Sequence, residues 1–248
     1  MSKRIAGMIV TALLLAGPAQ AQSASAPPNP WSAEVSVGWD INLSGALLKS
    51  GIGTLDGRAT VIEEQSFSDV FGTGVQWRFG AGYMYDERQE LRAALTIQNV
   101  SADAVELGTV DARPLFGTFD DYTSVAIDVG YRYHLDQAFQ NGRVRPYVGA
   151  TIGLAFISEM DADLAVPELG IVINDANFYD GTTAFAFGVE GGALIGLNDR
   201  LDLNVNLGFR YTGGLSDIDP LVNSGLDDIN DDSGRWTLPV MVGVRFKF

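Results

Sequence analysis

The sequence contains no cysteine, a single histidine, and only 16 Lys and Arg residues against 31 Asp and Glu. The absence of cysteine excludes disulfides, thiolate metal sites and cysteine nucleophiles. The deficit of positive charge argues against nucleic acid as a partner. Beyond the first residues no apolar run approaches the ~20 residues that a spanning helix needs, so we expect no transmembrane helix in the rest of the chain.

The N-terminus has the pattern of an export signal. A basic pair, Lys3 and Arg4, precedes a short apolar stretch and the small-residue sequence Ala-Gln-Ala. This order predicts a cleaved signal peptide over residues 1–21, because the apolar stretch is too short for the alternative, an N-terminal membrane anchor. Residues 22–30 are rich in Ser, Ala and Pro and are predicted to form a flexible spacer ahead of one domain over residues 31–248.

Most of that domain alternates between apolar and polar or small residues. In residues 31–43 every odd position is apolar, a separation that only a β-strand produces. Seven further segments repeat the pattern, and their apolar sets begin at Val75, Leu91, Val125, Val148, Phe185, Leu201 and Trp236. The chain is therefore predicted to be all-β, a transmembrane antiparallel up-and-down barrel of about eight strands.

The connections between these segments alternate in length. The short links are predicted at residues 86–89, 136–143 and 198–200, and the long ones at 44–73, 100–121, 157–181 and 212–235. Short periplasmic turns and four long extracellular loops are typical of outer-membrane barrels, whereas a lipocalin-like soluble barrel would turn its apolar face inward. Strand-like pieces at 59–62 and 170–174 are too short to cross a membrane, so external hairpins are favoured over a ten-stranded barrel.

Aromatic residues on the apolar face gather at both ends of the predicted strands. Those at the loop ends are Trp39, Trp77, Phe156, Phe185, Tyr211 and Trp236, and those at the turn ends are Tyr83, Tyr85, Tyr131, Tyr133, Phe246 and Phe248. Such sorting predicts two interfacial girdles around a membrane-spanning apolar band.

Four of the strand segments carry a family resemblance. They are VAIDVGYRYHL (125–135), RPYVGATIGLAF (145–156), LDLNVNLGFRY (201–211) and the terminal VMVGVRFKF. They resemble small porin-family barrels of the opacity and OmpA-transmembrane type, over the strands but not the loops. The resemblance implies a location in the outer membrane of a Gram-negative bacterium, among outer-membrane lipid and lipopolysaccharide. It also implies an assembly signal at Phe246 and Phe248, read by the barrel-assembly machinery.

Charge is distributed unevenly between the loops and the interior. The long loops hold 21 Asp and Glu but only 4 Lys and Arg, so the acidity is predicted to be extracellular. Inward strand positions carry both signs, and an eight-stranded barrel is just wide enough for side chains to fill it. A salt-bridge plug is therefore favoured over a narrow ion path. The residues expected to form this lumen network are Glu34, Arg78, Arg92, Asp128, Arg132, Arg145, Glu190, Asp202, Arg210, Arg245 and Lys247, with Asp40 also facing inward.

Two sets of contacts within this network are predicted, the first from barrel closure and the second from mid-strand inward positions, where Arg78 and Arg92 are the most central cations. The last strand should lie beside the first, so Glu34 is expected to form a salt bridge with Arg245 or Lys247 across the seam. Asp128 and Glu190 are expected to join the central arginines in one network across the lumen.

Other candidate sites have weaker support. The acidic stretch at 227–234 suggests calcium, but its turn glycine comes one position late and no glutamate closes the loop. Histidine 134 lies at a turn end beside Arg132, where a structural role is favoured over catalysis. No catalytic residue, metal or cofactor is assigned.

The leading functional hypothesis is a non-enzymatic barrel that presents acidic loops, for envelope integrity or for contact with an unknown extracellular partner. The alternative is a small channel for ions or small solutes. An outer-membrane enzyme ranks third, because no cluster of His or Ser is predicted on the extracellular side.

Overall fold

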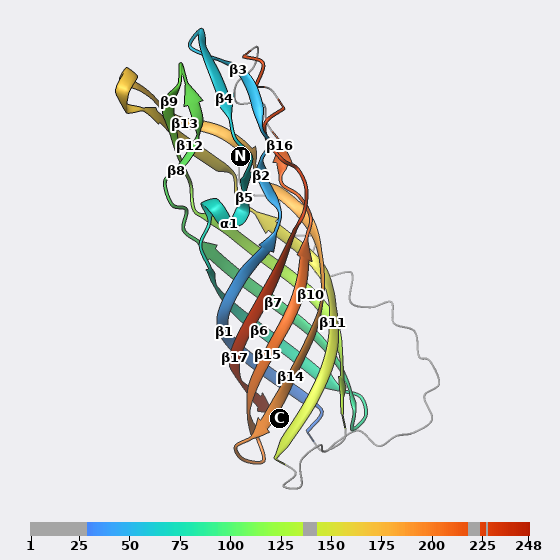
Figure 1. The fold of residues 1–248 in the computed structure, drawn as a ribbon. Helices are drawn as coiled ribbons and strands as arrows, with labels where there is room; N and C mark the ends of the chain where they lie inside the picture. Colours follow the sequence, from blue (N-terminus) through green and yellow to red (C-terminus); the bar gives the residue numbers. More distant parts are fainter. Residues whose placement is uncertain (1–28, 136–142, 218–223, 227) are drawn as a thin grey trace, which may run out of the picture.

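The chain forms a closed eight-stranded barrel that is prolonged at one end (Figure 1). The computed structural model describes residues 29–135, 143–217, 224–226 and 228–248, so the predicted signal peptide and nearly all of the spacer lie outside it. Within these residues no helix is long and apolar enough to cross a membrane. The barrel strands are β1 (Trp31–Ser44), β6 (Gly74–Met84), β7 (Gln89–Val100), β10 (Tyr122–His134), β11 (Val144–Ile157), β14 (Thr182–Gly196), β15 (Leu201–Thr212) and β17 (Arg235–Lys247).

Each barrel strand pairs antiparallel with its neighbours in chain order, and β1 pairs with β17 to close the ring. The predicted fold class, an up-and-down antiparallel barrel of eight strands, is confirmed. In β1, buried and exposed residues alternate over nine consecutive positions from Ser32 to Asp40. The exposed set is apolar and the buried set is polar, the inverse of a water-soluble protein, because lipid is the outer solvent.

The aromatic residues of the outer face lie at the ends of the strands. Trp39 and Trp77 are 58% and 48% exposed toward the extension, and Phe246 and Phe248 are 42% and 59% exposed at the opposite end. Trp31 adds to the second group, with its ring centroid 4.7 Å from that of Tyr83. These two groups mark the two membrane interfaces.

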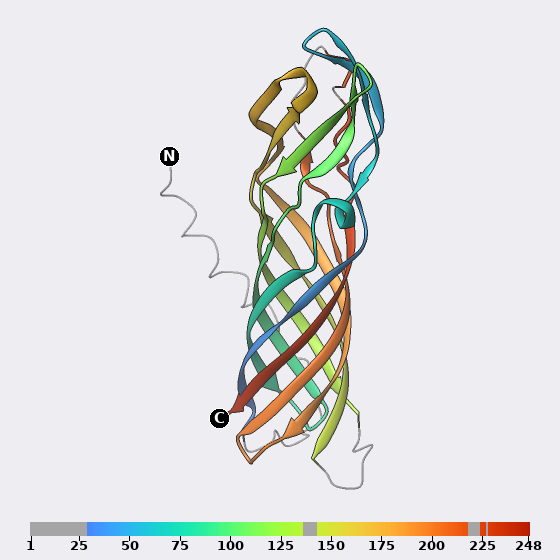
Figure 2. The ribbon, with the colours of Figure 1, turned by 60° about the vertical axis from the view of Figure 1, so that its left-hand side comes forward.

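Above the barrel the four long connections fold together into a second structure, which we call the extension (Figures 1 and 2). Its main sheet has the order β16-β13-β12-β9-β8-β4-β3, and β2 and β5 form a separate pair. The elements are β2 (Ala46–Leu48), β3 (Gly51–Leu55), β4 (Arg58–Ile62), β5 (Gln65–Ser66), α1 (Phe67–Val70), β8 (Val105–Val110), β9 (Arg113–Phe119), β12 (Met160–Val166), η1 (Pro167–Leu169), β13 (Ile171–Asp180) and β16 (Ser216–Asp217).

The fourth connection contacts strands near both ends of the sheet. The backbone nitrogen of Thr54 on β3 donates to the carbonyl of Ser224 at 2.7 Å, and that of Lys49 donates to the carbonyl of Ile229 at 2.6 Å. The side chain of Asn230 donates to the carbonyl of Phe178 on β13 at 2.6 Å. The described residues of this connection therefore fasten it to β3 and to β13.

The extension has its own apolar core. Leu107, Leu115, Leu164, Phe178 and Leu226 are each at most 2% exposed and belong to one continuous buried cluster. The external hairpins expected at 59–62 and 170–174 are present as β3–β4 and β12–β13. The hairpin β8–β9 and the joining of all three hairpins into one sheet were not predicted. The long connections are thus parts of one folded unit and not four separate loops.

Candidate functional site

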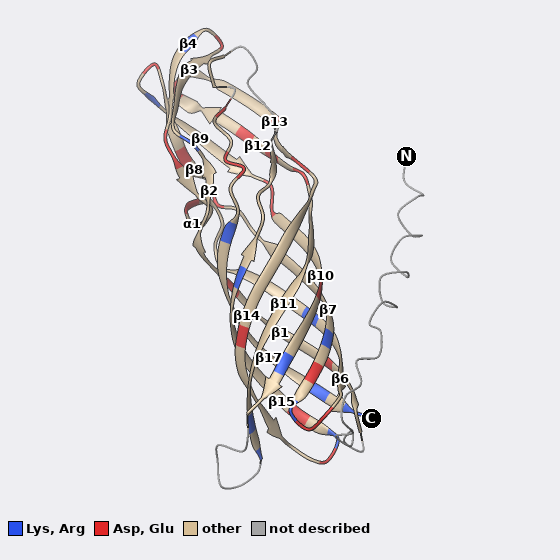
Figure 3. Cartoon of the chain, turned by 90° about the vertical axis from the view of Figure 1, so that its right-hand side faces the viewer, with Lys and Arg blue, Asp and Glu red and all other residues tan. Residues whose placement is uncertain are grey.

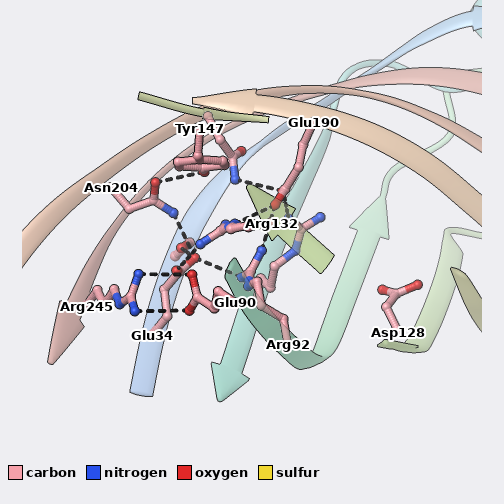
Figure 4. A network of polar contacts seen from close by, with 12 residues as sticks. Glu34, Glu90, Arg92, Asp128, Arg132, Tyr147, Glu190, Asn204 and Arg245 are labelled. Atoms are coloured by element: carbon pink, nitrogen blue, oxygen red, sulfur yellow. Dashed lines mark hydrogen bonds and ion pairs between the residues drawn. The ribbon is translucent and has the colours of Figure 1, made fainter. Parts of the chain in front are cut away.

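Glutamate 190 on β14 is one centre of the ionic network inside the barrel (Figure 4). It accepts from the guanidinium groups of three arginines, Arg132 at 2.7 Å, Arg92 at 2.8 Å and Arg78 at 3.4 Å. The three donors come from β10, β7 and β6. One carboxylate therefore connects strands on opposite parts of the barrel wall.

Glutamate 34 on β1 is the second centre. It accepts from Arg132 at 3.1 Å and from Arg92 at 3.2 Å, and Asn204 donates to it at 2.9 Å. Because Arg92 and Arg132 each contact both glutamates, the four side chains form a closed ring of alternating charge, which we call the central ring. Their side chains are 0–6% exposed. Charges this buried are tolerated only when each is paired and hydrogen-bonded.

A third carboxylate, Glu90, lies below the central ring at the turn end of the lumen. Both terminal nitrogens of Arg245 contact its two oxygens, at 3.0 and 3.1 Å, in a bidentate pair. The Nε2 atom of His134 lies 2.9 Å from the same carboxylate. The predicted lumen set leaves out Glu90, although the predicted turn ends at residue 89. Its spacing of two residues from Arg92 was the signal that it faces inward.

The other predicted lumen residues lie apart from the central ring. Asp128 forms two hydrogen bonds with Arg210, both at 3.1 Å. Of the four residues expected to form one network, Arg78 and Arg92 contact Glu190, whereas Asp128 pairs with Arg210 instead. Lys247 contacts Asp202 at 3.0 Å near the turn end, where the lysine is partly exposed.

Arginine 145 does not join the network. It is the second residue of β11 and is exposed at the turn end, and it forms no ion pair with any described residue. Its position on the inward face follows the predicted alternation, but it lies beyond the filled part of the lumen. Water can solvate the guanidinium there, so no protein partner is required.

Glu34 and Arg245 are direct neighbours in the β1–β17 register, as barrel closure requires. The predicted salt bridge between them is nevertheless absent, because Glu34 pairs with Arg92 and Arg132 while Arg245 pairs with Glu90. Side chains in a narrow barrel extend toward its axis, so they meet residues of distant strands before those of the adjacent strand.

Above the ion pairs, Arg235 connects the polar lumen to the apolar core of the extension. It donates to Asn42 and to Gln98, each at 3.3 Å. Its guanidinium lies 4.0 Å from the ring centroid of Tyr122 and 5.1 Å from that of Phe67, both within cation–π range. Ion pairs and amides therefore occupy the lumen between Glu90 and Arg235, and aromatic and aliphatic residues of the extension pack beyond them.

Many acidic residues lie on the extension, whereas most Lys and Arg residues lie in the barrel (Figure 3). Two cations of the extension are already neutralised, Arg58 by Asp111 at 2.9 Å and Arg113 by Glu168 at 2.7 Å. Partial burial and the nearby Asp120 and Asp175 carboxylates raise the pKa of Asp161 above its usual value. The extension thus carries a concentrated negative charge.

The acidic stretch considered for calcium has a structural role in its described part. Ile229 and Asn230 are 3% and 0% exposed and fasten the fourth connection to β2 and β13. Among the described residues no three His, Cys, Asp or Glu side chains are placed to hold a metal ion. Asp227 lies outside the described residues.

Comparison with solved structures finds several chains that are similar to this one. The outer membrane protein OprG from Pseudomonas aeruginosa is 16% identical with a TM-score of 0.52, and the match covers 89% of this chain and 97% of OprG. Neisserial surface protein A is 17% identical with a TM-score of 0.47, over 88% of this chain and 97% of that chain. Ail of Yersinia pestis is 10% identical with a TM-score of 0.39, over 88% and 99%.

A comparison with curated proteins found no match. The family model described as the outer membrane protein beta-barrel domain matches residues 9–246, nearly the whole sequence. Together with the closed eight-stranded barrel and its inverted polarity, this match establishes the class of protein. The chain belongs to the outer membrane protein β-barrel family, whose members reside in the bacterial outer membrane.

Proposed function

We propose that this protein is a non-enzymatic barrel whose lumen is closed by a plug of ion pairs and which presents a folded, acidic extension at the cell surface. The extension would serve envelope integrity or contact with an extracellular partner. The observation that carries the proposal is the central ring, in which Glu34, Arg92, Arg132 and Glu190 join four strands across the lumen.

The central ring obstructs ions both sterically and electrostatically. An eight-stranded barrel leaves room for little more than its own side chains. The arginines and glutamates satisfy one another, so a passing ion would have to separate buried pairs, which is strongly unfavourable. Conducting pores present groups that bind ions weakly and release them, and the central ring lacks that property.

The apolar core of the extension supports closure from the other side. Tyr122 and Phe67 cover Arg235 at the top of the polar lumen. The buried leucines and Phe178 continue the packing beyond them. A solute from outside would therefore meet a packed core before it reached the central ring.

The proposal also covers export and assembly. We propose that residues 1–21 are removed as a signal peptide and that Phe246 and Phe248 form the signal read by the barrel-assembly machinery. In support, both aromatic rings lie on the outer face, 42% and 59% exposed, and the Phe248 nitrogen donates to the carbonyl of Trp31 at 3.0 Å. Outer-membrane lipid and lipopolysaccharide would surround the exposed apolar band.

Measurement of solute uptake distinguishes the plug from the alternative function, a narrow channel for ions or small solutes. Liposomes that contain the folded protein should swell no faster in small sugars than protein-free liposomes. Folding is verified beforehand by faster electrophoretic migration of unheated than of boiled protein, since a closed barrel has no free edge at which to fray. Rapid swelling would overturn the plug and support the channel.

A further inference from the structure

The outer face of the extension carries an exposed apolar band that no part of the described chain covers. We call it the apolar stripe. It crosses six neighbouring strands of the main sheet, β3, β4, β8, β9, β12 and β13. Its exposed apolar members are Ile52, Val61, Phe116 and Val172, and the partly exposed Thr109, Pro114 and Ala165 lie between them.

The strand register makes the stripe continuous. Ile52 lies opposite Val61, Val61 opposite Thr109, and Thr109 opposite Pro114. On β9 the row continues two residues beyond Pro114, at Phe116. Phe116 lies opposite Ala165, and Ala165 lies opposite Val172. Residues paired in this way have Cβ atoms ~5 Å apart, so their side chains touch in a row.

The stripe serves neither the core nor the membrane. Ile52 is 80% exposed, Val172 65%, Val61 42% and Phe116 39%. The residues that alternate with them on the same strands, such as Leu115, already fill the apolar core. The strands that carry the stripe belong to the extension, which lies above the barrel strands (Figures 1 and 2). Exposed apolar patches of this kind in water mark interaction surfaces.

The sheet offers a partner its face and part of one edge. The backbone of β3 bonds to Ser224 of the fourth connection, and β13 pairs with the short strand β16 only at Tyr179 and Asp180. The stripe lies on the face, so a partner that binds it docks through side chains and not by strand addition.

Acidic side chains without an ion pair border the stripe and determine the charge of the partner. Glu106 lies directly opposite Phe116, Glu63 follows β4 two residues after Val61, and Asp163 lies two residues before Ala165. Asp163 accepts a hydrogen bond from the backbone nitrogen of Asp175 at 3.0 Å. None of the three forms an ion pair with a described residue. A second copy of the chain or an anionic lipopolysaccharide headgroup would meet like charge here, which is costly at an interface.

We propose that the apolar stripe binds a cationic amphipathic polypeptide whose apolar side chains lie on the stripe and whose Lys or Arg residues meet the bordering acids. This inference deepens the proposed function, because it assigns a chemistry to the surface partner. Six strands at ~4.8 Å spacing span roughly 24 Å, which matches about seven residues of extended chain.

The test uses the full-length mature protein in nanodiscs of zwitterionic lipid, with empty nanodiscs subtracted. Three fluorescent peptides of eight residues are titrated, with alternating Leu and Lys, alternating Ser and Lys, and alternating Leu and Glu. We expect the Leu-Lys peptide to bind tightest and to weaken as salt is raised. Equal binding of the Ser-Lys peptide, preferential binding of the Leu-Glu peptide, or no binding would overturn the proposal.

Variants locate the binding on the stripe. The double substitution Phe116→Ser with Val172→Ser should weaken binding of the Leu-Lys peptide about tenfold or more. Glu106→Gln should weaken binding and reduce its salt dependence, whereas Asp103→Asn, at an exposed acid away from the stripe, should leave both unchanged. Unchanged affinity in the double variant, with resistance to proteolysis showing that the extension is folded, would overturn the assignment.

The outcomes separate this inference from the plug. If the protein keeps liposomes impermeable to sugars but does not bind the Leu-Lys peptide, only the proposal of binding at the stripe is refuted. If the protein lets sugars into liposomes but binds the peptide at the stripe, only the proposal of a closed lumen is refuted.

Discussion

Glu34 and Arg245 lie opposite each other across the seam of the barrel, yet each forms its ion pairs with strands farther away. Glu34 contacts β7 and β10, and Arg245 contacts β7. The seam is therefore held by backbone hydrogen bonds and by side chains that cross the lumen, rather than by a bridge between adjacent strands.

Removing the Glu34 charge should destabilise the whole barrel. In Glu34→Gln the buried guanidinium groups of Arg92 and Arg132 lose one of their two carboxylates. We expect the free energy of unfolding to fall by about 3–5 kcal/mol. Urea unfolding of the protein in lipid vesicles, followed by tryptophan fluorescence, measures the change.

The matched control is an exposed pair of the same type. Arg58→Gln breaks the pair with Asp111, in which both side chains are more than 40% exposed. A pair this exposed contributes at most about 1 kcal/mol. Equal unfolding midpoints for Glu34→Gln and Arg58→Gln would show that the central ring contributes little to stability.

The eight barrel strands could be predicted from the sequence because their pattern repeats at every second residue. Observed strand ends such as Ser44 and Gly74 fall within a residue or two of the predicted ones. The inward position of Glu34 and Glu190 followed from the same alternation. Their partners could not be predicted, because alternation fixes which face a residue occupies but not how far its side chain reaches across the lumen.

The extension was harder to predict because its strands are short and its turns are unusual. The β3–β4 hairpin turns at Asp56 and Gly57, both at positive φ. An Asp-Gly pair is a strong hairpin signal that the sequence prediction did not use. The β8–β9 hairpin turns at Asp111-Ala112, also at positive φ, where alanine gives no such signal. Contacts between the connections depend on residues far apart in the sequence, such as Asn230 and Phe178.

Shortening a core side chain of the extension should destabilise the extension without unfolding the barrel. Leu115 is 1% exposed within the apolar cluster, so Leu115→Ala should destabilise the extension by about 2–5 kcal/mol. Limited proteolysis should then cleave the extension of the variant and spare that of the parent protein. The unheated variant should still migrate faster than the boiled one. Loss of that difference would mean that barrel and extension unfold as a single unit.

The orientation in the membrane can be tested against a clean background, because the chain has no cysteine. A maleimide that cannot cross the membrane should label Thr118→Cys, on the exposed face of β9, in intact cells. It should label Glu87→Cys, in the turn before β7, only after lysis. The reverse pattern would invert the topology.

Assembly should depend on the C-terminal aromatic residue. Deleting Phe248 removes both its ring and its backbone bond to Trp31, so unfolded chain should accumulate in the periplasm. Phe248→Tyr keeps an aromatic ring and should assemble normally. Normal outer-membrane levels of the deletion variant would argue against an assembly signal at this residue.

Conductance across a planar lipid bilayer tests the closed lumen most directly. The parent protein should show little or rare conductance. The double variant Glu190→Ala with Arg132→Ala removes one anion and one cation of the central ring and opens space between them. Its conductance events should be larger or more frequent, while Glu168→Gln on the extension should behave like the parent. Steady, high conductance of the parent protein would contradict the plug.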